Sequence, residues 1–78
     1  MPKIGQMVVY HTAEEQRNKM ENAPECNVQT ELPAIIVAVW SDNCVNLQVI
    51  PDGNPTEGFW VTSALKGTEE YNWEPIEN

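Results

Sequence analysis

The chain has 78 residues, and its 12 carboxylates against 4 basic side chains give a formal net charge of −8 at pH 7. A chain of this length has room for one small domain, 1–78, with a single core, which argues against a second folded unit or a deep catalytic cleft. The acidic balance opposes contact with phosphate backbones and anionic lipids, so we expect no direct nucleic-acid binding and no membrane binding, whereas a basic partner protein would be attracted.

The first predicted element is a strand over residues 5–12, where alternate side chains point to opposite faces. The following segment, 13–31, is polar, has no sustained apolar period and contains Pro24, so it is predicted to be a long loop. Helix formers in its first part favour a turn or two of helix, with Thr12 as N-cap and Glu15 as its capping-box partner. Because such a helix has almost no apolar face, we expect it to be marginal or disordered.

Four more strands follow, separated by segments rich in turn residues. The predicted strands cover residues 34–40, 44–50, 59–64 and 71–76, with turns at 51–58 and 65–68. The strand at 34–40 is rich in β-branched side chains, which favour extended structure. Five short strands with a long connection after the first fit an all-β fold, a small five-stranded, partly open SH3-like barrel.

The hairpin between residues 34–40 and 44–50 decides which way Trp40 points. The second of these strands has one apolar face, made of Val45, Leu47 and Val49. A two-residue turn would place Trp40 opposite this face, whereas a three-residue loop, 41–43, with Asn43 in the left-handed region, would turn it away. The longer loop places three large β-branched side chains in the core: Ile35, Val37 and Val39. We therefore predict the longer loop, which leaves Trp40 on the outer face.

A contact surface is predicted around this tryptophan. In the chosen register its neighbours are small or carry amides, and a large amphipathic ring among such side chains is typical of a binding surface. In the FWV segment, Phe59 and Val61 make the better core pair, so Trp60 is also expected outside. The predicted binding surface comprises Trp40, Asn46, Gln48 and Trp60.

Two other interpretations of the tryptophans stay open. Trp40 can cover the open end of the barrel or lie beneath the 13–31 loop, and three tryptophans can be bulky fillers of a small core. Trp73, near the end of the sequence, is expected to be a lid on the core. Exposure of two indoles on one face would exclude the filler interpretation for those two.

Catalytic and metal-binding patterns do not survive inspection. His11, Cys44 and a carboxylate are the residue types of a nucleophilic triad, but no strained elbow surrounds the cysteine. Zinc needs about four ligands in close pairs, which His11, Cys26 and Cys44 do not form, and Asp52-Gly53-Asn54 lacks the spaced acids of a calcium loop. The four glycines occur singly, so there is no phosphate-cradling loop. We predict no catalytic residues, no metal site, no cofactor and no enzyme.

The sequence also bears on compartment and assembly. It shows no apolar leader segment and no stretch long enough to span a membrane, so we expect a cytoplasmic protein. Cys26 and Cys44 are then expected to be reduced, although their spacing leaves a disulfide open. Association into a homo-oligomer would supply burial that so small a core lacks.

One stretch resembles a known family. Residues 39–47, Val-Trp-Ser-Asp-Asn-Cys-Val-Asn-Leu, preceded by Leu-Pro-Ala at 32–34 and followed by Pro-Asp-Gly at 51–53, resemble small proteins of unassigned role encoded by tailed bacteriophages and prophages. These proteins begin with a G-x-x-V-x-Y strand and end in a Trp-containing tail. The resemblance covers residues 4–12 and 32–75, with nothing matched in the 13–31 loop. It implies a phage-encoded accessory protein with an SH3-like barrel and no known catalytic residues.

Together these observations predict a non-enzymatic, phage-encoded binding protein. Its partner would be a host or phage protein or a small ligand, and its role would be to inhibit a host factor or to sequester a small signalling ligand. The alternative is a minor structural protein of a tailed-phage virion. The expected location is the host cell cytoplasm, or the virion in the second case.

Overall fold

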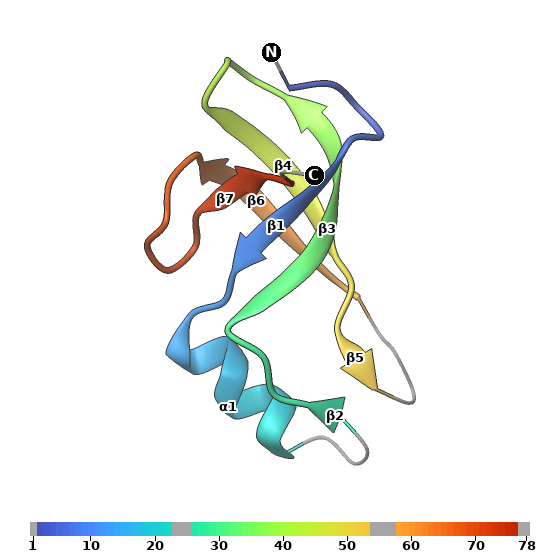
Figure 1. Cartoon of the computed structure of the whole chain (residues 1–78), viewed down its shortest axis with the longest axis vertical. Helices are drawn as coiled ribbons and strands as arrows, with labels where there is room; N and C mark the ends of the chain where they lie inside the picture. The colour runs from blue at the N-terminus through green and yellow to red at the C-terminus, as the bar shows by residue number, and fades with distance from the viewer. Residues whose placement is uncertain (1, 23–25, 54–57, 77–78) are drawn as a thin grey trace.

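Five antiparallel strands form the main sheet, in the order β6-β4-β3-β1-β7 (Figure 1). The computed structural model describes residues 2–22, 26–53 and 58–76. The strands are β1 (Met7–His11), β3 (Glu31–Val39), β4 (Cys44–Val49), β6 (Phe59–Leu65) and β7 (Trp73–Pro75). The last strand lies beside the first, and the sheet is not closed. The expected all-β fold, a five-stranded and partly open SH3-like arrangement, is therefore confirmed.

The five predicted strands are present, with shifted ends. β3 begins at Glu31, earlier than expected, and includes Pro33. Proline lacks an N–H and is disfavoured in a central strand. Here β4 has already ended at Val49, opposite Ala34, so Pro33 lies beyond the part of β3 that pairs with β4. Its carbonyl still accepts the Ile50 N–H at 3.0 Å. Part of the turn expected at 51–58, residues 54–57, lies outside the described residues, as does Pro24.

The segment after β1 contains a helix, α1 (Glu14–Asn22), rather than a marginal turn. Figure 1 shows it at the end of the sheet where β1 finishes and β3 begins. Met20 is 6% exposed and belongs to the core, so one apolar side chain anchors an otherwise polar helix. Two short strands, β2 (Cys26–Asn27) and β5 (Asp52–Gly53), pair beyond it, which the sequence did not indicate.

The helix cap differs from the prediction by one position. Ala13 precedes the helix, and its N–H is accepted by the side-chain oxygen of Gln16 at 2.8 Å, which is half of a capping box. Thr12, the expected N-cap, is buried and donates its hydroxyl to the Gln29 carbonyl at 2.8 Å. The prediction was wrong because the threonine side chain is used to hold the incoming 26–30 segment.

The core lies on the inner side of the bent sheet. It collects the inward side chains of all five strands and Met20: Val8, Tyr10, Leu32, Ala34, Ile36, Val45, Leu47, Val49, Val61, Ala64 and Trp73. Phe59 packs against this cluster, edge-on to Tyr10 with ring centroids 6.1 Å apart. Trp73 is 2% exposed and shares its indole N–H between the carbonyls of Asn43 (3.2 Å) and Ala64 (3.1 Å), as expected of a lid on the core.

A β-bulge changes which residues of β3 point inward. Val39 pairs with Val45, as the three-residue loop requires, but Asn43 does not have the positive φ that was predicted for it. The register also shifts between Ile36 and Ala38. Ile36 then pairs with Leu47 and is fully buried, whereas Val37 is the extra residue and is 43% exposed. The predicted inward set of Ile35, Val37 and Val39 was therefore right only for Val39, which packs against the core.

Candidate functional site

The outer side of the sheet carries a continuous set of apolar side chains. Met7 on β1 pairs with Ile35 on β3. Gln48 on β4 lies between Ile35 and Trp60, so this row crosses four strands. A second row consists of Trp40, Cys44 and Leu65. Cys44 pairs with Leu65 on β6, and its carbonyl oxygen accepts the backbone N–H of Trp40 at 2.9 Å. We define the outer face as Met7, Ile35, Val37, Trp40, Gln48, Ile50, Trp60 and Leu65.

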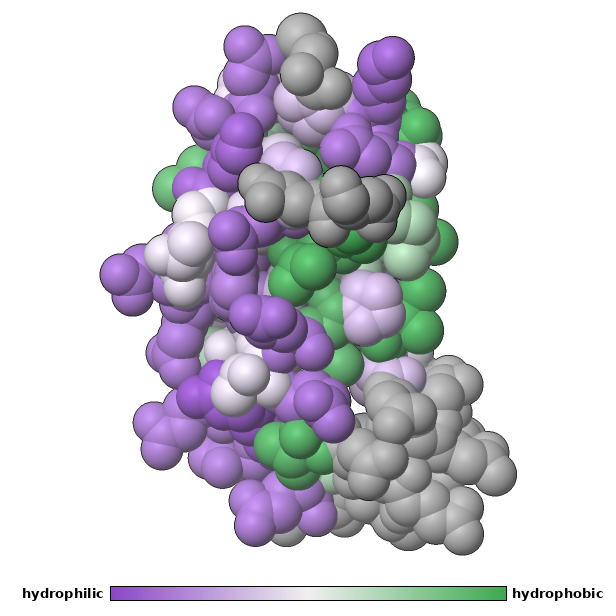
Figure 2. Space-filling model, in the orientation of Figure 1, coloured by the Kyte–Doolittle hydropathy of each residue, from purple (hydrophilic) through white to green (hydrophobic). Residues whose placement is uncertain are grey.

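The exposure of the outer face decides between the interpretations of the tryptophans. Trp40 and Trp60 are each 64% exposed, so neither is a core filler or is overlaid by the segment after β1. Four aliphatic or thioether side chains of the face are 38 to 57% exposed: Met7, Val37, Ile50 and Leu65. Figure 2 shows hydrophobic side chains gathered on the side where β3 runs, with hydrophilic ones on the opposite side. None of the eight residues carries a charge.

Asn46 is not exposed as the predicted surface requires. It is 8% exposed, and its side-chain oxygen accepts the Trp40 indole N–H at 2.9 Å and the Ser63 backbone N–H at 2.8 Å. Ser63, with a φ of 53°, lies in a second bulge, on β6. A bulged residue loses its ladder partner, and the amide of Asn46 replaces that partner. The correction is that Asn46 holds the outer face in shape from between two bulged strands instead of forming its surface.

Several members of the outer face were missed from the sequence. Met7 alternates with the buried Val8 and Tyr10, so its outward direction was readable from the strand period. Ile50 follows the inward Val49 in the same way. Val37 was not readable, because only the bulge turns it outward.

His11 is engaged by two carboxylates. Its Nε2 lies 2.5 Å from a Glu74 oxygen and its Nδ1 lies 4.0 Å from a Glu31 oxygen. Cys44, a free thiol, follows the far end of β3, and the nine residues of that strand separate the two by about 25 Å. The structure therefore does not bring together the histidine and cysteine that a nucleophilic triad would need. No cluster of three or more potential metal ligands occurs among residues 2–22, 26–53 and 58–76.

Acidic side chains gather on the other side, where α1 meets the loop between β6 and β7. Arg17 donates to a Glu70 carboxylate oxygen at 2.9 Å, and the same oxygen accepts the Glu14 backbone N–H at 3.1 Å. The Tyr71 hydroxyl donates to the Glu15 carboxylate. This hydrogen bond stabilises the neutral phenol and raises the pKa of Tyr71 to about 12. These contacts attach the helix to the loop between β6 and β7 and are structural in character.

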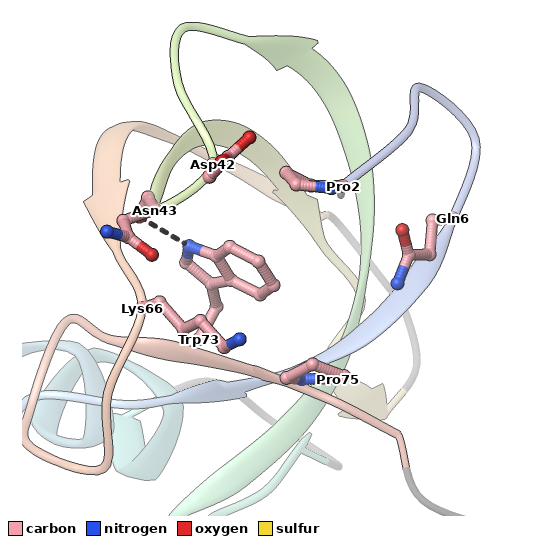
Figure 3. A pocket seen from close by; sticks show the side chains of 7 residues that line it. All are labelled: Pro2, Gln6, Asp42, Asn43, Lys66, Trp73 and Pro75. Carbon is pink, nitrogen blue, oxygen red and sulfur yellow. Dashed lines mark hydrogen bonds between the residues drawn. The ribbon is translucent and has the colours of Figure 1, made fainter.

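A small cavity lies at the mouth of the barrel (Figure 3). Its volume is about 170 Å³, and its walls include the Trp73 indole, Lys66, Asp42 and Gln6. Sites for drug-sized ligands occupy about 300–1,000 Å³, so this cavity is too small to be the principal binding site. The outer face is therefore the better candidate.

Comparison with known proteins adds no family. No protein-family model matches the chain, and neither the curated proteins nor the solved structures contain a significant match. No helix within the described ranges combines the length and apolar character that crossing a bilayer requires. The functional argument therefore rests on the geometry of the outer face.

Proposed function

We propose that this protein is a non-enzymatic interaction protein that acts by associating through its outer face. The carrying observation is that Trp40 and Trp60 are each 64% exposed on a face whose members are uncharged. Tryptophan is among the residues most enriched at binding hot spots, where truncation costs about 2 kcal/mol or more. Large apolar patches that stay exposed on a small folded domain mark interaction sites.

The two indoles are presented by rigid parts of the fold. The Trp40 ring is held through its N–H by Asn46, and Trp60 stands on β6 directly beside Gln48. A side chain that is already ordered loses less conformational entropy when a partner covers it. This preorganisation supports a role for the Trp40 ring in recognition, and Trp60 adds a second exposed indole on the same face.

The proposed partner is a protein more than a small ligand. The cavity at the barrel mouth is only about 170 Å³, whereas the outer face extends over β1, β3, β4 and β6. By its resemblance to small phage proteins, the protein would act in the host cytoplasm, where it would inhibit a host factor. Sequestration of a small signalling ligand is the weaker version of this role.

Affinity capture with matched variants tests the proposal. Tagged wild-type protein, the double variant Trp40→Ser/Trp60→Ser and the control Tyr71→Asn are used to capture proteins from the bacterial host. Tyr71 is a 43% exposed aromatic outside the outer face, and asparagine tolerates its positive φ of 70°. We expect the double variant alone to lose the captured partner. Equal capture by all three proteins would contradict the proposal.

The second candidate is a minor structural component of a phage particle. The same apolar face would then pack among virion proteins. Mass spectrometry of purified particles separates the two roles. Presence in particles at a fixed copy number would favour the virion role, and absence together with early expression would favour action on the host.

A further inference from the structure

We infer that the occupant of the outer face is a second copy of this chain, so that the protein associates as a face-to-face dimer. The inference rests on the proposed association through the outer face, and it makes a second copy, instead of a host protein, the occupant of that face. Three properties of the described residues support it: the apolar area of the face, the position of the charges, and the chemistry of Gln48 at its centre.

The apolar area matches what a homodimer interface requires. Two indoles at 64% exposure and four further apolar side chains at 38 to 57% leave roughly 600 Å² of apolar surface on the face. A standard interface buries about 800 Å² on each partner, of which about 65% is apolar in homodimers, or roughly 500 Å². The face therefore supplies the apolar area that such an interface needs, and surrounding polar residues would supply the remainder.

The charges are placed so that two copies can meet. Glu14, Glu15 and Glu70 lie where α1 meets the β6–β7 loop, and Figure 1 shows that loop on the left, with β3 on the right. Glu31, at the start of β3, and Glu74, on β7, lie beside His11 on the same outer side of the sheet, beyond the eight residues of the outer face. The eight side chains of the outer face carry no charge, so a face-to-face pair of these side chains buries no carboxylate.

The central row is self-complementary. Gln48 is exposed between Ile35 and Trp60, and its amide offers both a donor and an acceptor. Across a two-fold axis the same patch meets itself, so an amide can pair with its own copy while the flanking apolar side chains pack against each other. Because the Gln48 amides of the two copies pair with each other, neither is left buried without a hydrogen-bond partner.

Sedimentation equilibrium of the full chain tests the inference. For the wild type, from about 1 µM to about 1 mM, we expect the mass to rise from that of the 8.8 kDa monomer to twice that value. Trp60→Ser should weaken dimerisation by about 100-fold or more, because each substitution is present twice in a two-fold interface. The control Tyr71→Asn should leave it unchanged. Higher salt should strengthen the dimer, because it screens repulsion between two acidic copies.

Gln48→Glu is a second variant that should not affect folding, because Gln48 is exposed and glutamate has nearly the same size. It places two carboxylates opposite each other, so the dimer should dissociate at pH 7 and recover near about pH 4, where glutamate takes up a proton. A wild type that stays at the monomer mass over the whole range would overturn the inference, as would a dimer unaffected by both outer-face variants.

The two proposals fail in distinguishable ways. A monomeric wild type removes the second copy as occupant, while the capture experiment still decides whether the outer face binds another protein. A dimer that dissociates on Trp60→Ser supports the inference. If the double variant nevertheless captures the same host proteins as the wild type, the proposed host-directed function fails and the dimer stands.

Discussion

Replacement of Asn46 by alanine tests the architecture that holds the outer face. The side-chain oxygen of Asn46 is the acceptor for the backbone N–H of Ser63 at 2.8 Å and for the Trp40 indole N–H at 2.9 Å. Without it, the Ser63 N–H, in a part-buried position on β6, loses its acceptor, at a cost of about 1–3 kcal/mol. The Trp40 ring is 64% exposed, so its N–H is rehydrated and adds less than about 1 kcal/mol.

The expected loss of unfolding free energy is therefore about 1–4 kcal/mol, with a central value of about 2 kcal/mol. A domain of 78 residues has a stability of about 4–12 kcal/mol, so this loss is a large share of the total. The thermal midpoint should fall by about 10 °C or more. The free energy of unfolding is measured by urea unfolding followed by far-ultraviolet circular dichroism. Tryptophan fluorescence is not used, because it would also report the local change around Trp40. Protein concentration is held fixed, since association shifts apparent stability.

Trp40→Phe is the matched control, because it removes the indole donor and keeps an aromatic ring. It should cost under about 1 kcal/mol, and the double variant with Asn46→Ala should show a coupling of similar size. A loss below about 0.5 kcal/mol for Asn46→Ala would refute the role assigned to Asn46. Equal losses for the two single variants would show that the indole bond, and not the bulge, determines the effect.

Three further predictions concern the register, the pH dependence and the lid. Ile36→Ala should destabilise the fold by about 2–5 kcal/mol and Val37→Ala by under about 0.5 kcal/mol in the same urea assay, and the reverse order would contradict the bulge. The Tyr71 phenol, titrated by its absorbance near about 295 nm, should ionise near pH 12 and return toward about 10 in Glu15→Gln. Because the pKa of Tyr71 is raised in the folded state, its contribution to stability is complete below about pH 10 and is lost as the pH rises toward 12. Trp73→Phe should lower the thermal midpoint by about 8 °C or more, since it removes a shared indole N–H and leaves a cavity in the core; an unchanged midpoint would show that the lid is dispensable.

The local pattern of the sequence determined the strands and the direction of both exposed tryptophans. Side chains alternate across a strand, and the length of a tight hairpin loop sets which residues face each other. These two rules turned Trp40 outward opposite Cys44 once the three-residue loop was chosen, and they placed Trp60 outside beside the inward Val61, although the inward set used to choose the loop held only for Val39. Both rules act over a few neighbouring residues, so no knowledge of distant segments was needed.

Only the tertiary structure decided which side chains of β3 enter the core, what Asn46 does, and that α1 forms an ordered helix. β3 pairs with β1 on one side and with β4 on the other, and the extra residue Val37 lets its inward side chains align with the inward side chains of both neighbours. As a result Ile36, and not Ile35, enters the core. Asn46 is buried because the bulge on β6 leaves a backbone donor that needs its amide. The helix forms because Met20 enters the core and Arg17 binds Glu70, fifty-three positions away. Each of these depends on pairing between segments distant in the sequence, which no local period encodes.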